Sequence, residues 1–234
     1  KPHPLDDLNV RKALLMAIDK EPIVKNITRM GEQPATTYIP PNIFPGFVVK
    51  PGYPYDPVKA RELLAKTPYK DTLPGVTMLC DNATPASSEL VQNVSNQWKT
   101  NLGLNIPLEA VETKVRRERV NKTDFAISIG NWIGDYPDPS TFTDKYRSNS
   151  ANNDSGWVSL KYDALLDQAT KEIDPKKRYR LLEQADEILE TEIPILPLYD
   201  ITNQYLFRDN VHGLNLNPRN MEMLKGVYVD RGTR

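Results

Sequence analysis

Two carboxylates in a short aromatic segment, residues 130–142, are the side chains best suited to chemistry in this sequence. Asp135 follows a glycine and precedes Tyr136 and a proline, and Asp138 lies between two prolines. Glycine and proline favour sharp, rigid turns. A carboxylate held in such a turn near the indole of Trp132 suits the binding of a small cation such as an amine. Two alternatives are that both aspartates only cap turns, or that they form the acid pair of a glycosidase, although this spacing is common by chance.

Few other residues offer catalytic or metal chemistry. His3 and His212 are the only histidines, which disfavours a Ser-His or Cys-His pair and a zinc or nickel site held by side chains. Cys80 is the single cysteine, which excludes an intramolecular disulfide, and its apolar neighbours predict a small buried hydrophobe. The Gly-x-Ser-x-Gly elbow and the glycine-rich phosphate loops are absent. We therefore expect a protein that is not an enzyme, with no catalytic residues, no metal and no cofactor.

Composition narrows the class of partner. The chain has 234 residues, enough for one large domain or two small ones. Its net charge is −1 and its lysines and arginines are spread along the sequence, so no basic stripe indicates a nucleic acid partner. No run of about eighteen apolar residues indicates a membrane span. The sequence predicts a globular protein that binds no nucleic acid.

Strands and helices are expected to alternate around the two aspartates. Short apolar runs predict strands at 75–80, 106–111 and 125–129, and the last of these leads directly into the aspartate loop. The first two strands flank a helix that ends at Gly103, which makes a βαβ unit with parallel strands. Further helices are predicted around 10–18, after Asp56-Pro57, within 114–122, at 160–172 and from Asp174-Pro175 onward.

Two segments do not fit this alternation. The proline-rich connector 31–54 is long for a loop within a compact domain, so we expect it to be packed and structural, or functional. Residues 193–199 form an apolar run whose prolines confine it to an edge strand or a bend. The fold class predicted from all these elements is α/β.

Six segments carry short motifs in a fixed order along the chain. They are LNVRKALLMAIDK at 8–20, IPP at 39–41, YPYDPVKARELL at 53–64, WKTNLGL at 98–104, WIGDYPDP at 132–139 with NN at 152–153 and GW at 156–157, and IPILPLY at 193–199. Each motif is weak alone. Together and in this order they resemble the family 5 solute-binding proteins of ABC importers, the oligopeptide- and dipeptide-binding proteins.

The resemblance implies a fold and a domain organisation. The fold would be the C-terminal lobe of a periplasmic-binding-protein type II-like molecule, with a mixed, partly parallel sheet flanked by helices. Residues 1–213 would form this ligand-binding lobe, and 214–234 a tail that returns toward an N-terminal lobe outside this sequence. The first residues are neither a signal peptide nor a methionine start, which fits a piece of a longer protein.

The resemblance also implies a site. In peptide-binding members the matching aspartate pairs with the α-amino group of the ligand, and the loop backbone binds the peptide as a strand would. This role falls on Asp135. Trp132 matches a tryptophan that lines a side-chain pocket, and the loop would contribute the remaining ligand-binding residues Asn131, Ile133, Gly134 and Tyr136.

The implied function is the peptide-binding component of an ABC importer, which closes two lobes over an extended ligand. Its partners would be the N-terminal lobe and an ABC permease, and it would contact a membrane only through that permease or a lipid anchor outside this chain. It would work outside the cytoplasm, in the periplasm or at the cell surface.

Three departures from the family pattern keep the ligand class open. Ile129 stands where oligopeptide binders often have arginine, Thr113 where a tryptophan is frequent, and Asn131 where a glycine is usual. One alternative is therefore the same fold binding a sugar, a nickel chelate or another small solute. Another is a ligand-free interaction module that docks a permease or a signalling partner. Outside the loop we expect packing roles for Trp98 and Trp157, and a solvated or salt-bridged surface position for Arg178.

Overall fold

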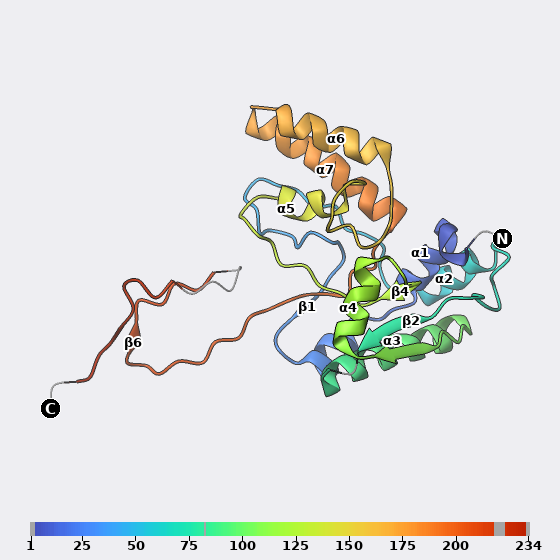
Figure 1. Cartoon of the computed structure of the whole chain (residues 1–234), viewed down its shortest axis with the longest axis horizontal. Helices are drawn as coiled ribbons and strands as arrows, with labels where there is room; N and C mark the ends of the chain where they lie inside the picture. The colour runs from blue at the N-terminus through green and yellow to red at the C-terminus, as the bar shows by residue number, and fades with distance from the viewer. Residues whose placement is uncertain (1–2, 82, 218–222, 233–234) are drawn as a thin grey trace.

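The fold combines a helix-flanked parallel sheet, a second layer of helices and a long extended tail (Figure 1). This computed structural model describes residues 3–81, 83–217 and 223–232. The order of its strands and helices confirms the predicted α/β class. In this described part of the chain, none of the helices combines the length and the apolar character needed to cross a membrane.

The sheet contains three parallel strands in the order β3-β2-β4. β2 (Met78–Asp81) lies in the middle and pairs along its whole length with β3 (Leu108–Val111). On its other side it pairs with β4 (Ile127–Ser128), which is shorter than the strand predicted at 125–129. All three strands lie where the apolar runs predicted them. Because they are parallel, their carboxyl ends meet at one edge of the sheet.

α3 (Pro85–Leu102) connects β2 to β3 and completes the predicted βαβ unit. The Thr84 side chain caps its start by accepting a hydrogen bond from the Ser87 backbone N–H. Gly103 ends the helix with a φ of 74°, a left-handed conformation that glycine adopts without steric cost. The helix end therefore follows from residues that act locally, as the sequence indicated.

The first hydrophobic core lies between the sheet and the helices α1 (Leu8–Met16), α2 (Pro57–Leu64) and α3. Trp98 of α3 is 1% exposed, and its indole Nε1 donates a 2.9 Å hydrogen bond to the carbonyl oxygen of Leu14. Its predicted place in the core is confirmed, as is the burial of Cys80. The described part of the chain also contains three short helical segments: η1 (Pro4–Asp6), η2 (Ile23–Thr28, a π-helix) and η3 (Asp144–Tyr146).

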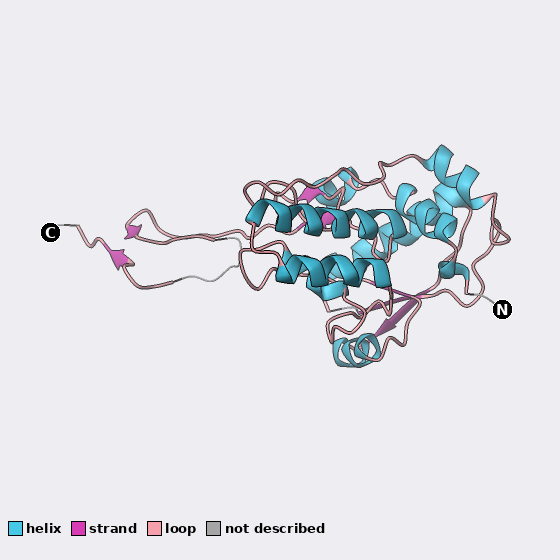
Figure 2. Cartoon of the chain, turned by 90° about the horizontal axis from the view of Figure 1, so that it is seen from above, coloured by secondary structure: helices cyan, strands magenta, loops and turns pink. Residues whose placement is uncertain are grey.

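The second layer is built from α5 (Ser140–Thr143), α6 (Leu160–Lys171) and α7 (Pro175–Glu192). α6 and α7 pack against each other, and α5 contacts α7 (Figures 1 and 2). An aromatic cluster fills this layer, and the connector between η2 and α2 contributes to it with the buried residues Ile39, Phe44 and Phe47. The connector is therefore packed, one of the two predicted alternatives. Trp157 also takes its predicted packing role, against the Tyr162 ring at 5.0 Å between centroids.

β1 (Gln33–Pro34) and β5 (Tyr199–Asp200) form a short antiparallel pair. Most of the apolar run 193–199 has no regular structure, with a bend at residues 194 and 195. Ile193 has a left-handed φ of 51°, and the two prolines lack the N–H that a ladder needs. Only its last residue belongs to a strand. The prolines therefore had the effect expected of them.

The chain leaves the helical body after β5 (Figure 1). Residues 201–208 form no helix or strand, and β6 (Val211–His212) then pairs with β7 (Tyr228–Val229) away from the body. Apolar side chains in this projection are exposed, Leu206 fully and Leu224 to 70%. The division into a lobe at 1–213 and a tail at 214–234 stays a prediction, and residues 218–222 and 233–234 of that tail lie outside the described part.

Candidate ligand-binding site

The loop 129–139 begins where β4 ends, at the carboxyl edge of the sheet. Arg116, on the exposed helix α4 (Thr113–Asn121), ties the start of the loop to the sheet: its Nη1 donates to the Ile129 carbonyl at 2.9 Å and its Nε to Asp81 at 2.7 Å. The backbone of 130–134 makes no hydrogen bond with any described residue. Its N–H and C=O groups are therefore available to a ligand, at the edge where α/β proteins usually bind one.

The exposure of the loop residues alternates along this unpaired backbone. Asn131, Ile133 and Asp135 are exposed, whereas Trp132 and Gly134 between them are partly buried. A period of two is the pattern of an extended strand with one face inward. The loop is thus a strand-like segment that lacks a hydrogen-bonded neighbour among the described residues.

Asp135 combines a fixed backbone with an unused carboxylate. Its N–H donates a 2.8 Å hydrogen bond to the hydroxyl of Thr141 on α5. Its carboxylate forms neither a hydrogen bond nor an ion pair with any residue that the structure describes. The oxygens of an exposed carboxylate without a partner are available to accept hydrogen bonds from a ligand cation.

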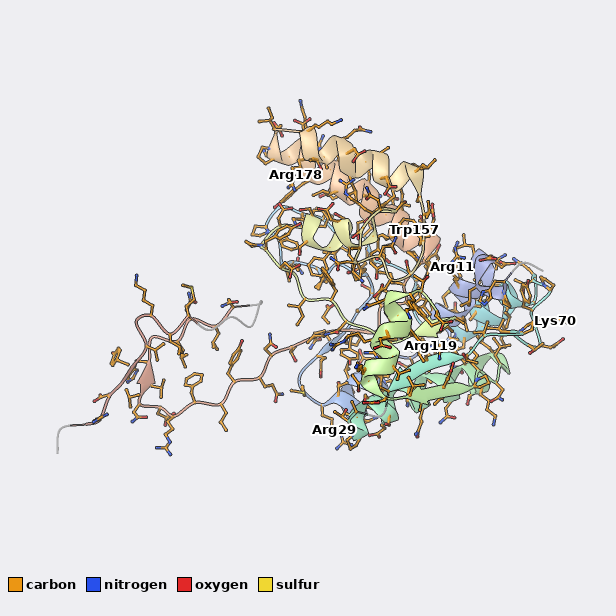
Figure 3. The ribbon with its side chains drawn as sticks, in the orientation of Figure 1. Arg11, Arg29, Lys70, Arg119, Trp157 and Arg178 are labelled. Atoms are coloured by element: carbon orange, nitrogen blue, oxygen red, sulfur yellow. The ribbon has the colours of Figure 1, made fainter. Side chains whose placement is uncertain are left out.

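Asp138 has the opposite environment. Arg178 of α7, labelled in Figure 3, binds both of its oxygens, at 2.7 and 2.8 Å. The N–H and the hydroxyl of Ser140 donate to the same carboxylate. Burial opposes the charged form, but these hydrogen bonds outweigh it and lower the pKa of Asp138 to about 2. The Asp138 carboxylate therefore connects the loop to α7 and is not available to a ligand. The turn-capping interpretation fits Asp138, which bonds Ser140 two residues on, and the unpaired carboxylate of Asp135 serves no turn.

Trp132 lies with its ring against the aromatic layer. Its Nε1 donates to the carbonyl oxygen of Thr141 at 2.9 Å, and the Lys145 Nζ lies 5.1 Å from the centre of its ring. Lys145 is only 8% exposed and also binds the Asn152 carbonyl and the Asp154 carboxylate. The segment that contains Asn152 and Asp154 is therefore attached next to Trp132. One edge of Trp132 is consequently fixed by packing, and only its remaining surface is available to a ligand.

The remaining predicted ligand-binding residues of the loop differ in whether they are exposed or packed against α5. Ile133 and Tyr136 present side chains that are 45% and 41% exposed. The Tyr136 hydroxyl lies 3.2 Å from the Ser140 hydroxyl oxygen. Gly134 is packed closely against α5, since a Cβ built on it would lie 3.0 Å from Thr141 Cγ2. A side chain at this position would require the Thr141 methyl group to shift, so the close approach of the loop backbone to α5 favours glycine.

Sequence reasoning missed the residues that hold the loop in place. Arg178 was expected at the surface, solvated or salt-bridged, and it is salt-bridged but three-quarters buried. No role was predicted for Arg116, Thr141 or Lys145. No spacing rule connects these three residues and Arg178 to the loop, because they lie on α4, α5, η3 and α7. Among the described residues, no group of three or more histidines, cysteines, aspartates or glutamates is arranged to hold a metal ion.

Comparison with known proteins identifies the family. The model of bacterial extracellular solute-binding proteins, family 5 (middle region), matches residues 1–154. The chain belongs to this family. Its fold is the periplasmic binding protein type II fold of the solved family 5 structures, which confirms the fold that the motifs implied.

Three relatives show the range of family 5 proteins that this chain resembles. The oligopeptide-binding protein OppA of Bacillus subtilis is 34% identical, over 90% of this chain and 40% of its own length. The probable deoxycholate-binding periplasmic protein YgiS of Escherichia coli is 30% identical, over 97% and 43%. The solved murein tripeptide-binding protein MppA of Escherichia coli superposes with a TM-score of 0.84 at 28% identity, over 98% and 46%. The chain therefore spans less than half the length of these relatives.

Proposed function

We propose that this chain is the C-terminal ligand-binding lobe of the peptide-binding component of an ABC importer. The observation that carries the proposal is the strand-like segment 131–135: the backbone of 131–134 has no described hydrogen-bonding partner, and the carboxylate of its last residue, Asp135, is unpaired among the described residues. An extended peptide can add to such an edge through its main chain, with affinity that is largely independent of its sequence. The ligand's α-amino group then pairs with Asp135.

The exposed side chains around the segment take the role of loose side-chain contacts. Asn131, Ile133 and Tyr136 are exposed, and the remaining surface of the partly buried Trp132 would border a side-chain pocket in the closed two-lobed protein. The protein is a binding protein and not an enzyme, in keeping with its family. It acts outside the cytoplasm, and an N-terminal lobe and an ABC permease complete the importer. Closure of the two lobes excludes water from the charged contact, which strengthens it.

The test is isothermal titration calorimetry of the complete two-lobed protein with tri- to pentapeptides, each free and N-acetylated. We expect N-acetylation and Asp135→Asn each to weaken binding by about tenfold to a hundredfold, the range for losing a charged hydrogen bond. Asp71→Asn, which removes an exposed carboxylate outside the loop, is the matched control and should leave the affinity unchanged. Equal affinity for free and N-acetylated peptides would show that Asp135 does not pair with the α-amino group of the ligand.

A second candidate is a small non-peptide solute, favoured by the similarity to YgiS and by Ile129, which stands where peptide binders often carry arginine. The exposed Ile133 and Tyr136 offer apolar contact for such a ligand. Thermal-shift screening with bile acids, sugars and metal chelates separates the two candidates. A shift with one of these and none with any peptide would replace the first proposal by the second.

A further inference from the structure

A pocket of about 400 Å³ lies between α7 and the last residues of the connector, Val48 to Pro54. Pro51, Tyr53 and Pro54 form an apolar wall, and the opposite wall is one face of α7. None of its lining residues belongs to the loop 129–139, so this is a separate site. Its volume is in the range of small-molecule sites.

Four acidic side chains of α7 line the pocket: Glu183, Asp186, Glu187 and Glu190. Three of them use one oxygen to hold the connector. Glu190 accepts from the Tyr38 N–H, Glu183 from the Val48 N–H, both at 2.9 Å, and Glu187 pairs with Lys50 at 2.8 Å. The second oxygen of each accepts no hydrogen bond from a described residue. The pocket therefore has acceptor capacity that its own walls do not use.

Asp186 differs from the other three because it has no partner. It is 2% exposed, and its Oδ1 is buried without a hydrogen bond in the part of the chain that the structure describes. Burial, together with the charges of Glu190 and Glu183, raises the pKa of Asp186 to about 8. A buried polar group without a partner is costly, so a group at this position that supplies a hydrogen bond and a positive charge would relieve the cost.

The other charged groups around Asp186 do not satisfy it. Lys50 is paired with Glu187 at the surface, and Arg180 lines the pocket but is exposed. Lys20 lies near Glu190 and donates a 2.6 Å hydrogen bond to the Ala35 carbonyl. On α6, the hydroxyl of Tyr162 donates to the Thr143 carbonyl. The pocket lining therefore contains two cations, Lys50 and Arg180, and four carboxyl groups, while Lys20 lies outside the lining near Glu190.

We propose that this pocket binds an organic cation, an alkylamine or alkyldiamine whose ammonium group pairs with Asp186 and whose carbon chain lies along Pro51, Tyr53 and Pro54. An amine is favoured over a metal ion because the described acidic groups are not arranged as metal ligands. A carbon chain suits the proline and tyrosine wall, and the ammonium supplies three donors for the unused carboxylate oxygens. When the ammonium enters, the carboxyl group of Asp186 releases its proton to solvent and pairs as the carboxylate.

The probe is 1,4-diaminobutane, with 1,4-butanediol as a neutral molecule of the same length. We expect saturable calorimetric binding of the diamine alone. Proton release makes the measured heat depend on the ionisation enthalpy of the buffer. Below about pH 8, the affinity should therefore increase as the pH is raised, by up to tenfold for each pH unit.

Three variants test the residue assignment. Asp186→Asn should weaken diamine binding by about tenfold or more and abolish the buffer dependence. Glu183→Gln, at the partly exposed rim, should weaken it less and guards against a folding defect in the first variant. Glu118→Gln on α4 removes an exposed carboxylate elsewhere and should change nothing. Binding of the diol as tight as that of the diamine, equal affinity in wild type and Asp186→Asn, or no saturation with diamine would each overturn the proposal.

Discussion

Replacing Arg178 with methionine should detach the loop 129–139 from α7 and destabilise the protein by about 1–2 kcal/mol at pH 7. Methionine keeps the apolar stem of the side chain but removes the two hydrogen bonds to Asp138. The half-buried carboxylate then retains only its bonds to Ser140. Because the pair connects residues 40 positions apart, the variant should also loosen the segment that carries Asp135.

The magnitude follows from the pKa of Asp138. The pKa falls from its ordinary 3.8 to about 2, and one pKa unit corresponds to about 1.4 kcal/mol, which sets an upper bound of about 2.5 kcal/mol for the stabilisation. The two side chains are 27% and 26% exposed, so water screens the pair and lowers the figure to about 1–2 kcal/mol. Since the folded pKa is depressed, this stabilisation is complete above about pH 4 and is lost as the pH falls through about 2.

Urea unfolding followed by tryptophan fluorescence measures the effect, and a double-mutant cycle with Asp138→Asn isolates the pair. Arg180→Met, an exposed arginine on the same helix without an ion pair to a described residue, is the matched control. We expect a coupling energy of about 1–2 kcal/mol at pH 7 that shrinks at pH 3. A coupling energy below about 0.5 kcal/mol, or equal losses in Arg178→Met and Arg180→Met, would show that this pair does not hold the loop.

Three further predictions concern other parts of the structure. The raised pKa of Asp186 favours its protonated form in the folded protein, so stability should fall as the pH rises from about 4 to about 8, by up to about 1.4 kcal/mol per pH unit. Urea unfolding at each pH measures this loss, and Asp186→Asn should reduce it. Trp98→Phe should cost about 1–3 kcal/mol, measured by thermal unfolding, because the Leu14 carbonyl loses its 2.9 Å hydrogen bond inside the core. Gly134→Ala should lower peptide affinity in calorimetry more than it lowers the melting temperature, because the added methyl group meets Thr141 at 3.0 Å and displaces the loop.

The boundaries of the main helices could be predicted because residues at helix ends act over a few positions. Asp56 before a proline marks the start of α2, Gly103 the end of α3, and Asp174 before a proline the start of α7. The strands followed from short apolar runs in the same way. The direction of the sheet followed from the helix between two of them, which only a parallel pairing accommodates.

The contacts that hold the loop could not be predicted by these rules. Arg178 lies among charged residues at the start of α7, and its sequence neighbourhood is the same whether water or a carboxylate faces it. Lys145 is a polar residue that periodicity would place at the surface, yet the ring of Trp132 and the carbonyl of Asn152 bury it. Both partners come from segments whose approach depends on the packing of the whole second layer. A chain-local rule carries no information about that packing.

The two aspartates of the loop show how one short sequence supports both positioning and binding. Asp138 is charged, bonded on both oxygens and partly buried, so its charge is paired with Arg178 within the protein. Asp135 is held through its backbone by Thr141, which fixes the backbone that carries the carboxylate and leaves the carboxylate itself free among the described residues. A ligand that meets this loop therefore orders few new groups, and pre-organisation of this kind raises affinity without added contacts. For the same reason ligand choice must rest on the outward side chains and on the surface that faces them, because the inward side of the loop is already committed to α5.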